Sequence, residues 1–453
     1  MIRHAYSSIS QLKPQVCIVG SGPAGFYCAH QILKVLPSCT VDIYERLPVP
    51  FGLVRYGVAP DHPEVKNVIN TFTKIGEDPR VNFYGNICLG QDVCLGDLKQ
   101  AYHAVVLCYG ADNDRKLNIP NENGGNIVSA RSFVGWYNGL PQDANLQVNL
   151  DCEEATLLGQ GNVAMDVARI LLTSVDELKS TDITEHSLEA LSRSRIKCVH
   201  LIGRRGPLQV AFTIKEFREM IKLNNVRTEF RTEQLAGVNE ALADLQRPRK
   251  RLSELILKSA SPDENKSNAS KYFRPIFLRS PKEFQLDGSG HVSGVQCAVN
   301  KLEGPVEKPN AVETERRELI PCGIAFRSIG YQSVCVDPAV PFDEKSCTVV
   351  PTEDVYSAGW LATGPVGVIL STMSNAFEVG QRIGQDLMSN SGAAAKPGSG
   401  HVLNIVKNKG IPIVSWEGWK AIDAEETRLG KLKGKPREKF VSVEQMLSVS
   451  GIR

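Results

Sequence analysis

Residues 16–25 have the sequence Val-Cys-Ile-Val-Gly-Ser-Gly-Pro-Ala-Gly, and this stretch decides the fold. Its four apolar residues predict a buried strand. The spacing Gly20-x-Gly22-x-x-Gly25 that follows is typical of a turn that joins a strand to a helix and binds a dinucleotide. In such a turn Gly20 permits the sharp bend, Gly22 leaves room for a pyrophosphate, and Gly25 lets the helix pack on the strand.

The residues after this turn extend the pattern to a βαβ unit. A helix is predicted over 23–35 and a second strand over 41–44, which implies a parallel sheet. Glu45 ends that strand, 20 residues after Gly25, where an acid can bind ribose hydroxyls. We therefore interpret the first unit as a dinucleotide site; the alternative is a tight structural turn.

A second glycine loop follows the strand predicted over 155–158. It has the sequence Gly159-Gln160-Gly161-Asn162-Val163-Ala164 and leads into a helix that ends near residue 172. Its partner strand, 198–202, is followed by Gly203-Arg204-Arg205-Gly206 in place of an acid. Two guanidinium groups can clamp a 2′-phosphate, so this unit favours NADP(H) over NAD(H). The alternative is a pair of solvated surface arginines.

A late block, 354–369, repeats the strand and glycine pattern. It contains a strand that ends beside Trp360, and then Gly364-Pro365-Val366-Gly367-Val368-Ile369, which can start a helix close to a flat ligand. A helix N-terminus there would stabilise negative charge on a reduced flavin. Two dinucleotide sites with this block suggest FAD in the first unit and NADPH in the second. Trp360 as a plain core aromatic is the alternative.

Composition excludes several other classes of protein. The 453 residues are 42% hydrophobic and 23% charged, with a formal net charge of +2, so no global basic field is available for nucleic acid or an anionic membrane. No apolar run approaches the ~20 residues of a membrane span. The twelve cysteines show no C-x-x-C spacing, so we predict no metal ligands and a reducing compartment. The basic, acid-free start, residues 1–10, fits a short mitochondrial transit peptide.

Two further stretches carry a specific resemblance. Residues 49–63 are VPFGLVRYGVAPDHP and residues 203–216 are GRRGPLQVAFTIKE. Both stretches resemble the adrenodoxin reductase family of mitochondrial ferredoxin–NADP⁺ reductases, and the similarity covers nearly the whole chain from about residue 15. The resemblance implies an α/β fold of the glutathione-reductase-like type, with two Rossmann-type domains. We expect an FAD domain from 1–110 and 330–453, and an NADP domain from 111–329.

The resemblance also implies which residues contact each cofactor. Together with Gly20, Gly22 and Gly25 of the first loop, the flavin contacts would be Ala24, Glu45, Leu53, Leu89, Trp360, Gly367, Val368 and Ile369. The NADP contacts would be Gln160, Gly161, Asn162, Val163, Arg204, Arg205, Glu216 and Gly367. The chain departs from the family at two places. Leu89 stands where Val is expected, and 361–363 lacks the basic residues that relatives often carry, which puts a partner contact there in doubt.

For the partner, the resemblance implies an acidic [2Fe–2S] ferredoxin of the adrenodoxin type. The densest basic run is Arg247-Pro248-Arg249-Lys250-Arg251, in a polar segment expected to be an exposed loop or helix edge. The family's ferredoxin-binding positions fall on Arg247 and Arg251, and Arg193, Arg195 and Lys197 could share the surface. A solvated charge cluster is the alternative.

Hydride transfer to a flavin depends on stacking and distance rather than on an acid–base pair, so no catalytic residue is assigned. Asp61 and His62 could manage a flavin proton; alternatively they are a loop acid and a histidine that caps a helix at Pro63. We expect a monomer that is peripheral to a membrane at most. A disulfide reductase would need a cysteine pair, a synthase subunit would bring its own cluster cysteines, and a nucleic-acid-binding protein would need more basic surface.

Overall fold

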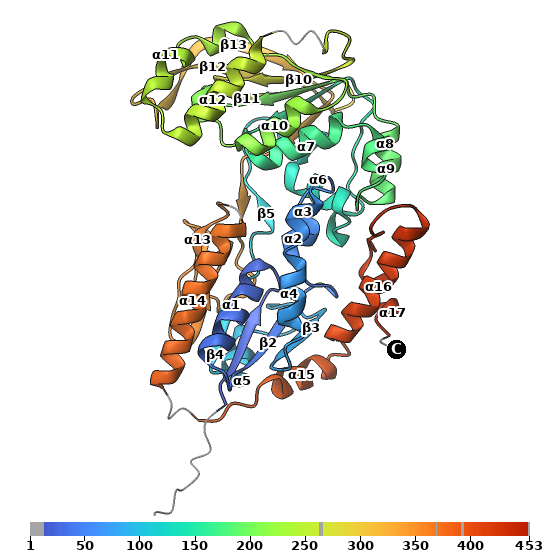
Figure 1. Ribbon diagram of the computed structural model, residues 1–453, viewed down its shortest axis with the longest axis vertical. Coiled ribbons are helices and arrows are strands. Elements are labelled where there is room, and N and C mark those ends of the chain that lie inside the picture. Colours follow the sequence, from blue (N-terminus) through green and yellow to red (C-terminus); the bar gives the residue numbers. More distant parts are fainter. Residues whose placement is uncertain (1–12, 262–265, 368, 391–393, 452–453) are drawn as a thin grey trace, which may run out of the picture.

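The computed structural model describes residues 13–261, 266–367, 369–390 and 394–451. It is elongated, with one sheet and its helices in the lower half of Figure 1 and a second set in the upper half. The chain begins in the lower half, runs through the upper half, and returns to the lower half after residue 332. The predicted transit peptide lies outside the described residues.

The lower half is built on a five-stranded parallel sheet with the order β18-β4-β1-β2-β3. The strands are β1 (Gln15–Val19), β2 (Thr40–Glu45), β3 (Val81–Gly85), β4 (Ala104–Leu107) and β18 (Val355–Ser357). Helix α1 (Pro23–Val35) follows β1 and packs against α14 (Ile369–Ser389). The two helices and the sheet enclose an apolar core. The predicted strand, turn and helix are all present.

The upper half contains a six-stranded parallel sheet with the order β6-β14-β7-β8-β10-β9. Its strands are β6 (Ile127–Ser129), β7 (Glu154–Leu158), β8 (Cys198–Ile202), β9 (Val226–Thr228), β10 (Lys271–Ile276) and β14 (Ile324–Arg327). Helices α7 (Asn162–Leu172), α10 (Ile214–Lys222) and α12 (Arg247–Ala260) pack on it around a second core. An antiparallel sheet of β11 (Arg279–Leu286), β12 (Val292–Glu303) and β13 (Asn310–Pro321) shares a third apolar cluster with it.

Several further helices are short, and three of them help to form the region between the two sheets. These three are α2 (Gly52–Tyr56), α3 (Pro63–Lys66) and α6 (Ala130–Asn138); the others are α4 (Ile69–Gly76), α5 (Leu95–Ala101), α8 (Val175–Leu178), α9 (Glu185–Ser192), α11 (Val238–Ala241) and α13 (Trp360–Thr363). The α/β fold class predicted from the sequence is confirmed by the two parallel sheets.

Two crossing segments join the halves. Strand β5 (Asn113–Asp114) leaves the first sheet and pairs antiparallel with β15 (Tyr331–Gln332), which returns to it. Each crossing begins at a glycine with positive φ, Gly110 at +75° and Gly330 at +114°. This conformation is one that glycine adopts without a Cβ penalty.

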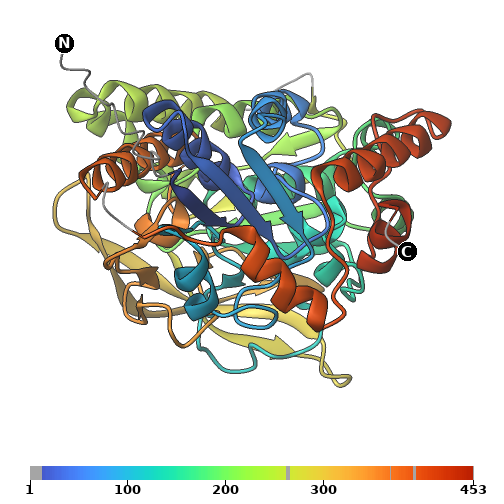
Figure 2. The ribbon, with the colours of Figure 1, turned by 90° about the horizontal axis from the view of Figure 1, so that it is seen from below.

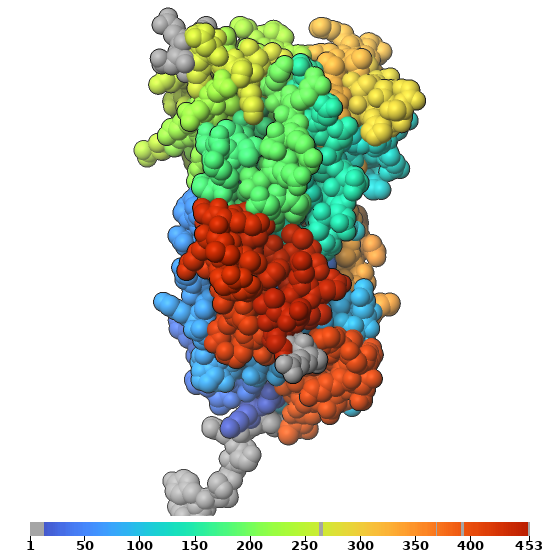
Figure 3. All heavy atoms as spheres, turned by 90° about the vertical axis from the view of Figure 1, so that its right-hand side faces the viewer, coloured from blue at the N-terminus to red at the C-terminus, as the bar shows by residue number. Residues whose placement is uncertain are grey.

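The C-terminal segment fastens the halves together from outside. Helix α15 (Ser399–Asn408) lies at the bottom of the lower half in Figure 1, and α16 (Trp416–Leu432) and α17 (Val443–Val449) lie along one side. Figure 2 shows the same helices from below, and in Figure 3 the red C-terminal segment touches parts of both halves. Lys439 lies 3.0 Å from Asp182 of the upper half, and Lys66 of the lower half lies 2.6 Å from the same carboxylate. A single buried carboxylate therefore ties together three distant parts of the chain.

Candidate cofactor site

A cavity of about 720 Å³ lies between the two halves and is lined by residues from both. This volume is in the range of cavities that enclose small organic ligands. Its walls come from the first glycine loop, from helix α2, from the late block and from the start of α7. The cavity therefore lies at the carboxyl ends of parallel strands, where open α/β sheets bind their ligands.

The first glycine loop has three glycines with three different environments. Gly20 has φ +105°, and a Cβ there would lie 2.6 Å from the carbonyl oxygen of Cys108. A Cβ on Gly25 would lie 2.1 Å from the Gly20 oxygen, so close packing of α1 requires glycine. A Cβ on Gly22 would meet no atom within 4 Å, although Gly22 lines the cavity. The loop thus leaves open space at the position where a pyrophosphate would approach, which fits a dinucleotide.

Glu45 is held in place beside this loop. Its Oε2 accepts hydrogen bonds from the Ser21 amide at 3.0 Å and the Ser21 hydroxyl at 2.7 Å, and its Oε1 accepts one from the Leu47 amide at 3.2 Å. The half-buried carboxylate also lines the cavity. It is fixed where a ribose hydroxyl could donate to it.

The stretch that carried the family resemblance packs directly on the first loop. Phe51 has φ +85°, which is rare for a bulky residue, and its amide donates to the Ser21 oxygen at 3.0 Å. Gly52 also has positive φ, and a Cβ there would lie 3.2 Å from the Gly22 Cα. Two consecutive residues in this conformation place α2 against the loop, so that Leu53 reaches the cavity wall.

The late block closes the other side of the cavity. A Cβ on Gly359 would lie 2.6 Å from the Cβ of Ala24, so the block contacts the first loop directly. Trp360 is half-buried on the cavity wall, with its ring 5.4 Å from that of Tyr331. Gly367 and Ile369 also line the cavity, and α14 begins at Ile369 as predicted. Val368 lies outside the described residues.

The second glycine loop mirrors the first. Gly159 has φ +131°, and a Cβ there would lie 2.0 Å from the Ser328 oxygen. A Cβ on Gly161 would meet nothing within 4 Å. Asn162 and Val163, at the start of α7, reach the cavity, whereas Gln160 lies against Gly203 at the end of β8. The second loop therefore also leaves space at its central glycine.

Arg204 and Arg205 follow β8 as expected but lie outside the cavity wall. Arg204 is exposed and Arg205 is half-buried. Within the described part of the chain, neither guanidinium group has a hydrogen bond or an ion pair. Two neighbouring cations without a carboxylate partner are available for a phosphate.

A buried charge network that the sequence did not predict borders the second loop. Arg169 of α7 is 2% exposed and pairs with Asp61, with Asp166 at 2.6 Å and with Glu216 at 3.2 Å. Burial raises the pKa of Asp166 to about 6, although Arg169 opposes the shift. Asp166 and Glu216 both line the cavity. The network thus ties the loop before α3 to the two helices that flank the second glycine loop.

The structure separates the roles of Asp61 and His62. Burial opposes ionisation of Asp61, but Arg169 outweighs it and holds the pKa of the carboxyl below its usual value. His62 is buried on the cavity wall with its Nε2 2.6 Å from Glu219 Oε2. His62 precedes α3, but its side chain makes no capping hydrogen bond. His62 is thus the N-cap residue of a helix that begins at Pro63, as the capping alternative expected, but its side chain contacts Glu219 instead of the helix amides.

The basic run lies on a helix rather than in a loop. Helix α12 begins at Arg247 and buries Leu252 and Ile256, whose spacing of four residues gives it an apolar face. Arg247 and Arg251 are exposed and, at a spacing of four, lie on one side of the helix. Neither is paired with a carboxylate of the described residues.

The other candidate cations have partners. Arg193 pairs with Glu189 at 3.2 Å, and Arg195 pairs with Asp151 at 3.1 Å. Lys197 pairs with Glu153 at 2.7 Å. Because nearby carboxylates neutralise these three cations, the structure does not support adding them to the basic surface formed by Arg247 and Arg251.

Taken together, the structure brings most of the predicted cofactor residues to one cavity. The predicted residues on its wall are Gly20, Gly22, Ala24, Glu45, Leu53, Leu89, Asn162, Val163, Glu216, Trp360, Gly367 and Ile369. Off the wall are Gly25, which packs α1, and Gln160, Gly161, Arg204 and Arg205, which extend from the cavity along the end of the second sheet.

The fold and the cavity define a class: an α/β protein with two dinucleotide-binding units that face a shared ligand cavity. Residues 18–84 match the family model described as an NAD(P)-binding Rossmann-like domain. The solved structure of Mycobacterium tuberculosis FprA in complex with NADPH superimposes with a TM-score of 0.91 at 34% identity, covering 97% of this chain and 99% of that one.

Two curated relatives are more similar in sequence. The NADPH:adrenodoxin oxidoreductase, mitochondrial, of Drosophila melanogaster is 51% identical, covering 97% of this chain and 94% of that protein. The human protein of the same name is 48% identical, covering 98% and 93%. The chain belongs to the family of mitochondrial NADPH:adrenodoxin oxidoreductases, as the resemblance predicted.

Proposed function

We propose that this chain is an FAD-dependent reductase that takes hydride from NADPH and passes single electrons to an acidic [2Fe–2S] ferredoxin of the adrenodoxin type. The observation that carries the proposal is the shared cavity between two glycine loops whose central glycines both face open space. Glu45 follows one loop and the unpaired Arg204 and Arg205 follow the other, so the loops suit different nucleotides. Family membership supports the same activity.

The first unit fits FAD. Gly20, Gly22 and Ala24 would cradle the pyrophosphate at the N-terminus of α1, and Glu45 would accept from a ribose hydroxyl. Leu53, Leu89, Trp360, Gly367, Val368 and Ile369 would surround the ring system. Gly359 packs so closely on Ala24 that position 359 has no room for a Cβ, which supports a tightly packed wall here.

The second unit fits NADP(H). Gln160, Gly161, Asn162 and Val163 would hold its pyrophosphate at the N-terminus of α7, and Arg204 with Arg205 would clamp the 2′-phosphate. Glu216 and Gly367 line the cavity where this unit meets the first, so they would flank the reacting end of the nucleotide.

When bound, the two cofactors supply hydride transfer followed by release of electrons one at a time. The residues of the chain position the two cofactors and enclose them. Arg169 holds Asp61, in the loop before α3, beside Glu216 of α10, and so ties that loop of the first unit to the helices of the second. Asp61 is committed to that ion pair, so His62, which faces the cavity and contacts Glu219, is the one of the two placed to exchange a proton.

The partner surface would be the exposed side of α12. Arg247 and Arg251 are exposed, lie on the same side of the helix, and have no carboxylate partner among the described residues. Their charges are therefore free to attract an acidic ferredoxin. The domain division would follow the two sheets, with 1–110 and 330–453 holding FAD and 111–329 holding NADP(H). Support for this division comes from the crossing segments at Gly110 and Gly330.

We further propose a mitochondrial matrix location, with a peripheral position on the inner membrane as the alternative, and a monomeric state. The relatives are named mitochondrial, and within the described ranges no helix is long and apolar enough to cross a bilayer. The electrons would serve cytochrome P450 systems, iron–sulfur cluster assembly, or both.

The experiment is an anaerobic titration of the purified protein. The oxidised protein should show a flavin spectrum, and the flavin released on denaturation should be FAD. One equivalent of NADPH should bleach it, and oxidised ferredoxin should then restore the flavin spectrum with two ferredoxins reduced per flavin. A colourless protein that binds NADPH, or a flavin that ferredoxin cannot reoxidise, would refute the proposal.

A further inference from the structure

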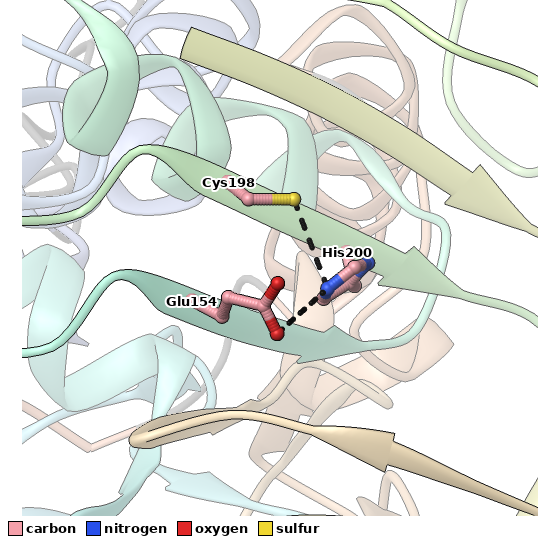
Figure 4. A group of neighbouring side chains, drawn as sticks. All are labelled: Glu154, Cys198 and His200. Carbon is pink, nitrogen blue, oxygen red and sulfur yellow. Dashed lines mark hydrogen bonds and ion pairs between the residues drawn. The ribbon is translucent and has the colours of Figure 1, made fainter.

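Three potential metal ligands meet on the second sheet, away from the cofactor cavity. Glu154 is the first residue of β7, and Cys198 and His200 are on β8, the neighbouring strand. Glu154 pairs in register with Cys198, and residues two apart on a strand share a face, so all three side chains lie on the same face. Figure 4 shows the three side chains pointing toward one another.

Two of the three distances between the ligand atoms match a tetrahedral metal site. The Sγ of Cys198 lies 3.7 Å from the Nε2 of His200, and that nitrogen lies 3.6 Å from the Oε2 of Glu154. All three atoms lie within 4.8 Å of one another. Zn²⁺ bonds to sulfur, nitrogen and oxygen at tetrahedral angles place such atoms roughly 3.4–3.6 Å apart. The sulfur–nitrogen and nitrogen–oxygen distances are close to these values, and the sulfur and the carboxylate must come as close for all three to bind one ion.

Burial and access are also those of a metal site. Cys198 and His200 are 4% and 6% exposed, whereas the side chain of Glu154 is 33% exposed and marks the way in from solvent. Two buried polar atoms beside the group, His200 Nδ1 and Thr156 Oγ1, have no hydrogen-bond partner in the described structure. Thr156 is paired in register with His200, so its side chain lies on the same face of the sheet.

A divalent cation would balance the charge of these three ligands. A thiolate and a carboxylate carry two negative charges and a neutral imidazole none, so one M²⁺ makes the site neutral. Arg274, which is paired in register with His200, is the nearby cation, and its Nε donates to Glu229 at 2.9 Å. Its positive charge also acts on Cys198 and Glu154, so a bound metal would share these two ligands' charge with Arg274.

We propose that Glu154, Cys198 and His200 form a binding site for a thiophilic divalent cation of the Zn²⁺ class, with water as the fourth ligand. On binding, the metal displaces the thiol proton, which is released to solvent. The three ligands lie at or near the amino ends of β7 and β8, whereas the second glycine loop follows their carboxyl ends. The site is therefore separate from the proposed nucleotide site.

The spacing of Glu154, Cys198 and His200 in the sequence does not predict a metal site. Familiar zinc spacings place ligands on loops or helix turns, and the cysteine count showed none of them. Here the spacing is Cys-x-His on one strand, and the third ligand comes from a strand 44 residues earlier.

The test is a titration of the flavin-loaded protein with CoCl₂. Tetrahedral Co²⁺ with a thiolate ligand absorbs in the red, where oxidised flavin does not. We expect one Co²⁺ per chain, displaced by one equivalent of ZnCl₂ and unaffected by excess MgCl₂. Glu154→Gln and Cys198→Ser should each weaken Co²⁺ binding by more than about ten-fold, a loss that even outer-shell partners can cause. The matched control is Cys152→Ser, a half-buried thiol of the same domain outside the group, which should bind as wild type.

The outcomes separate clearly. A wild-type protein that gives no red absorbance with Co²⁺ refutes the site, whether or not the variants fold. Binding that survives in both Glu154→Gln and Cys198→Ser, or that is lost in Cys152→Ser, places the metal elsewhere and also refutes it. Since flavin content is read from the same spectra, a variant that loses its fold is recognised by loss of the flavin band.

Discussion

The substitution Gly22→Ala tests the first glycine loop with little disturbance of the fold. Gly22 has φ −79° and ψ −172°, an extended conformation open to any residue, and its added Cβ would meet no protein atom within 4 Å. The protein without flavin should therefore be unchanged in stability or more stable by about 0.4–1 kcal/mol, because alanine has fewer unfolded conformations.

The loss of binding free energy caused by Gly22→Ala should appear only when FAD is bound. The methyl group occupies the space left for the pyrophosphate, and an extra methyl in a filled site costs about 1–3 kcal/mol. This corresponds to FAD binding weaker by about 5–150-fold. The matched control is Gly25→Ala, whose Cβ would lie 2.1 Å from the Gly20 oxygen and should destabilise the protein with or without flavin.

The assay compares the two variants by urea unfolding of the flavin-free protein and by equilibrium binding of FAD. We expect Gly22→Ala to combine wild-type or higher unfolding free energy with weak FAD binding, and Gly25→Ala to lose unfolding free energy. A Gly22→Ala protein with wild-type FAD affinity would show that the loop is a structural turn, and the reasoning would be refuted.

Three further predictions follow from the charged groups. Replacing Arg204 and Arg205 by glutamine should reduce the preference for NADPH over NADH by ten-fold or more, since each charge-assisted contact contributes roughly 1.5–3 kcal/mol. Binding titrations with NADPH and with NADH measure this preference. Reversing Arg247 and Arg251 to Glu should raise the KM for ferredoxin and reverse its salt dependence while NADPH-to-ferricyanide turnover stays near wild type. Burial lowers the pKa of Lys439 to about 7, so between about pH 7 and 10 the unfolded chain binds more protons than the folded protein. The free energy of unfolding should therefore rise with pH across that window. Urea unfolding at pH 7 and pH 9 measures this rise, which should be smaller in Lys439→Met.

Each of these predictions has its own control and contradicting result. An unchanged nucleotide ratio would remove the arginine clamp from the account. For the partner surface, Arg195→Glu is the control because that cation is already paired with Asp151. Equal loss of ferredoxin and ferricyanide activity would mean damage to the fold or to the nucleotide site. For Lys439, identical pH dependence in the wild type and the Met variant would contradict the depressed pKa.

Local patterns in the sequence were enough for the elements that hold the cofactors. The predicted helix over 23–35 coincides with α1 because Pro23 begins it and the glycine loop precedes it. Both glycine loops, the strand ends at Glu45 and Ile202, and the start of α14 also lie where the sequence placed them.

Contacts between distant residues could not be predicted in the same way. Arg169 meets Asp61 across 108 positions, and Glu154 meets His200 across two strands, so no local spacing records either group. The polar segment that begins at Arg247 was expected to be a loop or helix edge, because its charges dominate its composition. Its burial of Leu252 and Ile256 makes it a helix of the second core.

The most direct test of the central claim is NADPH-dependent reduction of cytochrome c with and without a mitochondrial-type [2Fe–2S] ferredoxin. Cytochrome c accepts electrons from reduced ferredoxin, so its reduction reports electron flow through the partner. The account predicts a slow rate with the protein alone, a rate that rises and saturates with added ferredoxin, and little activity with NADH. Equal rates with and without ferredoxin, in a protein whose flavin NADPH reduces, would contradict it.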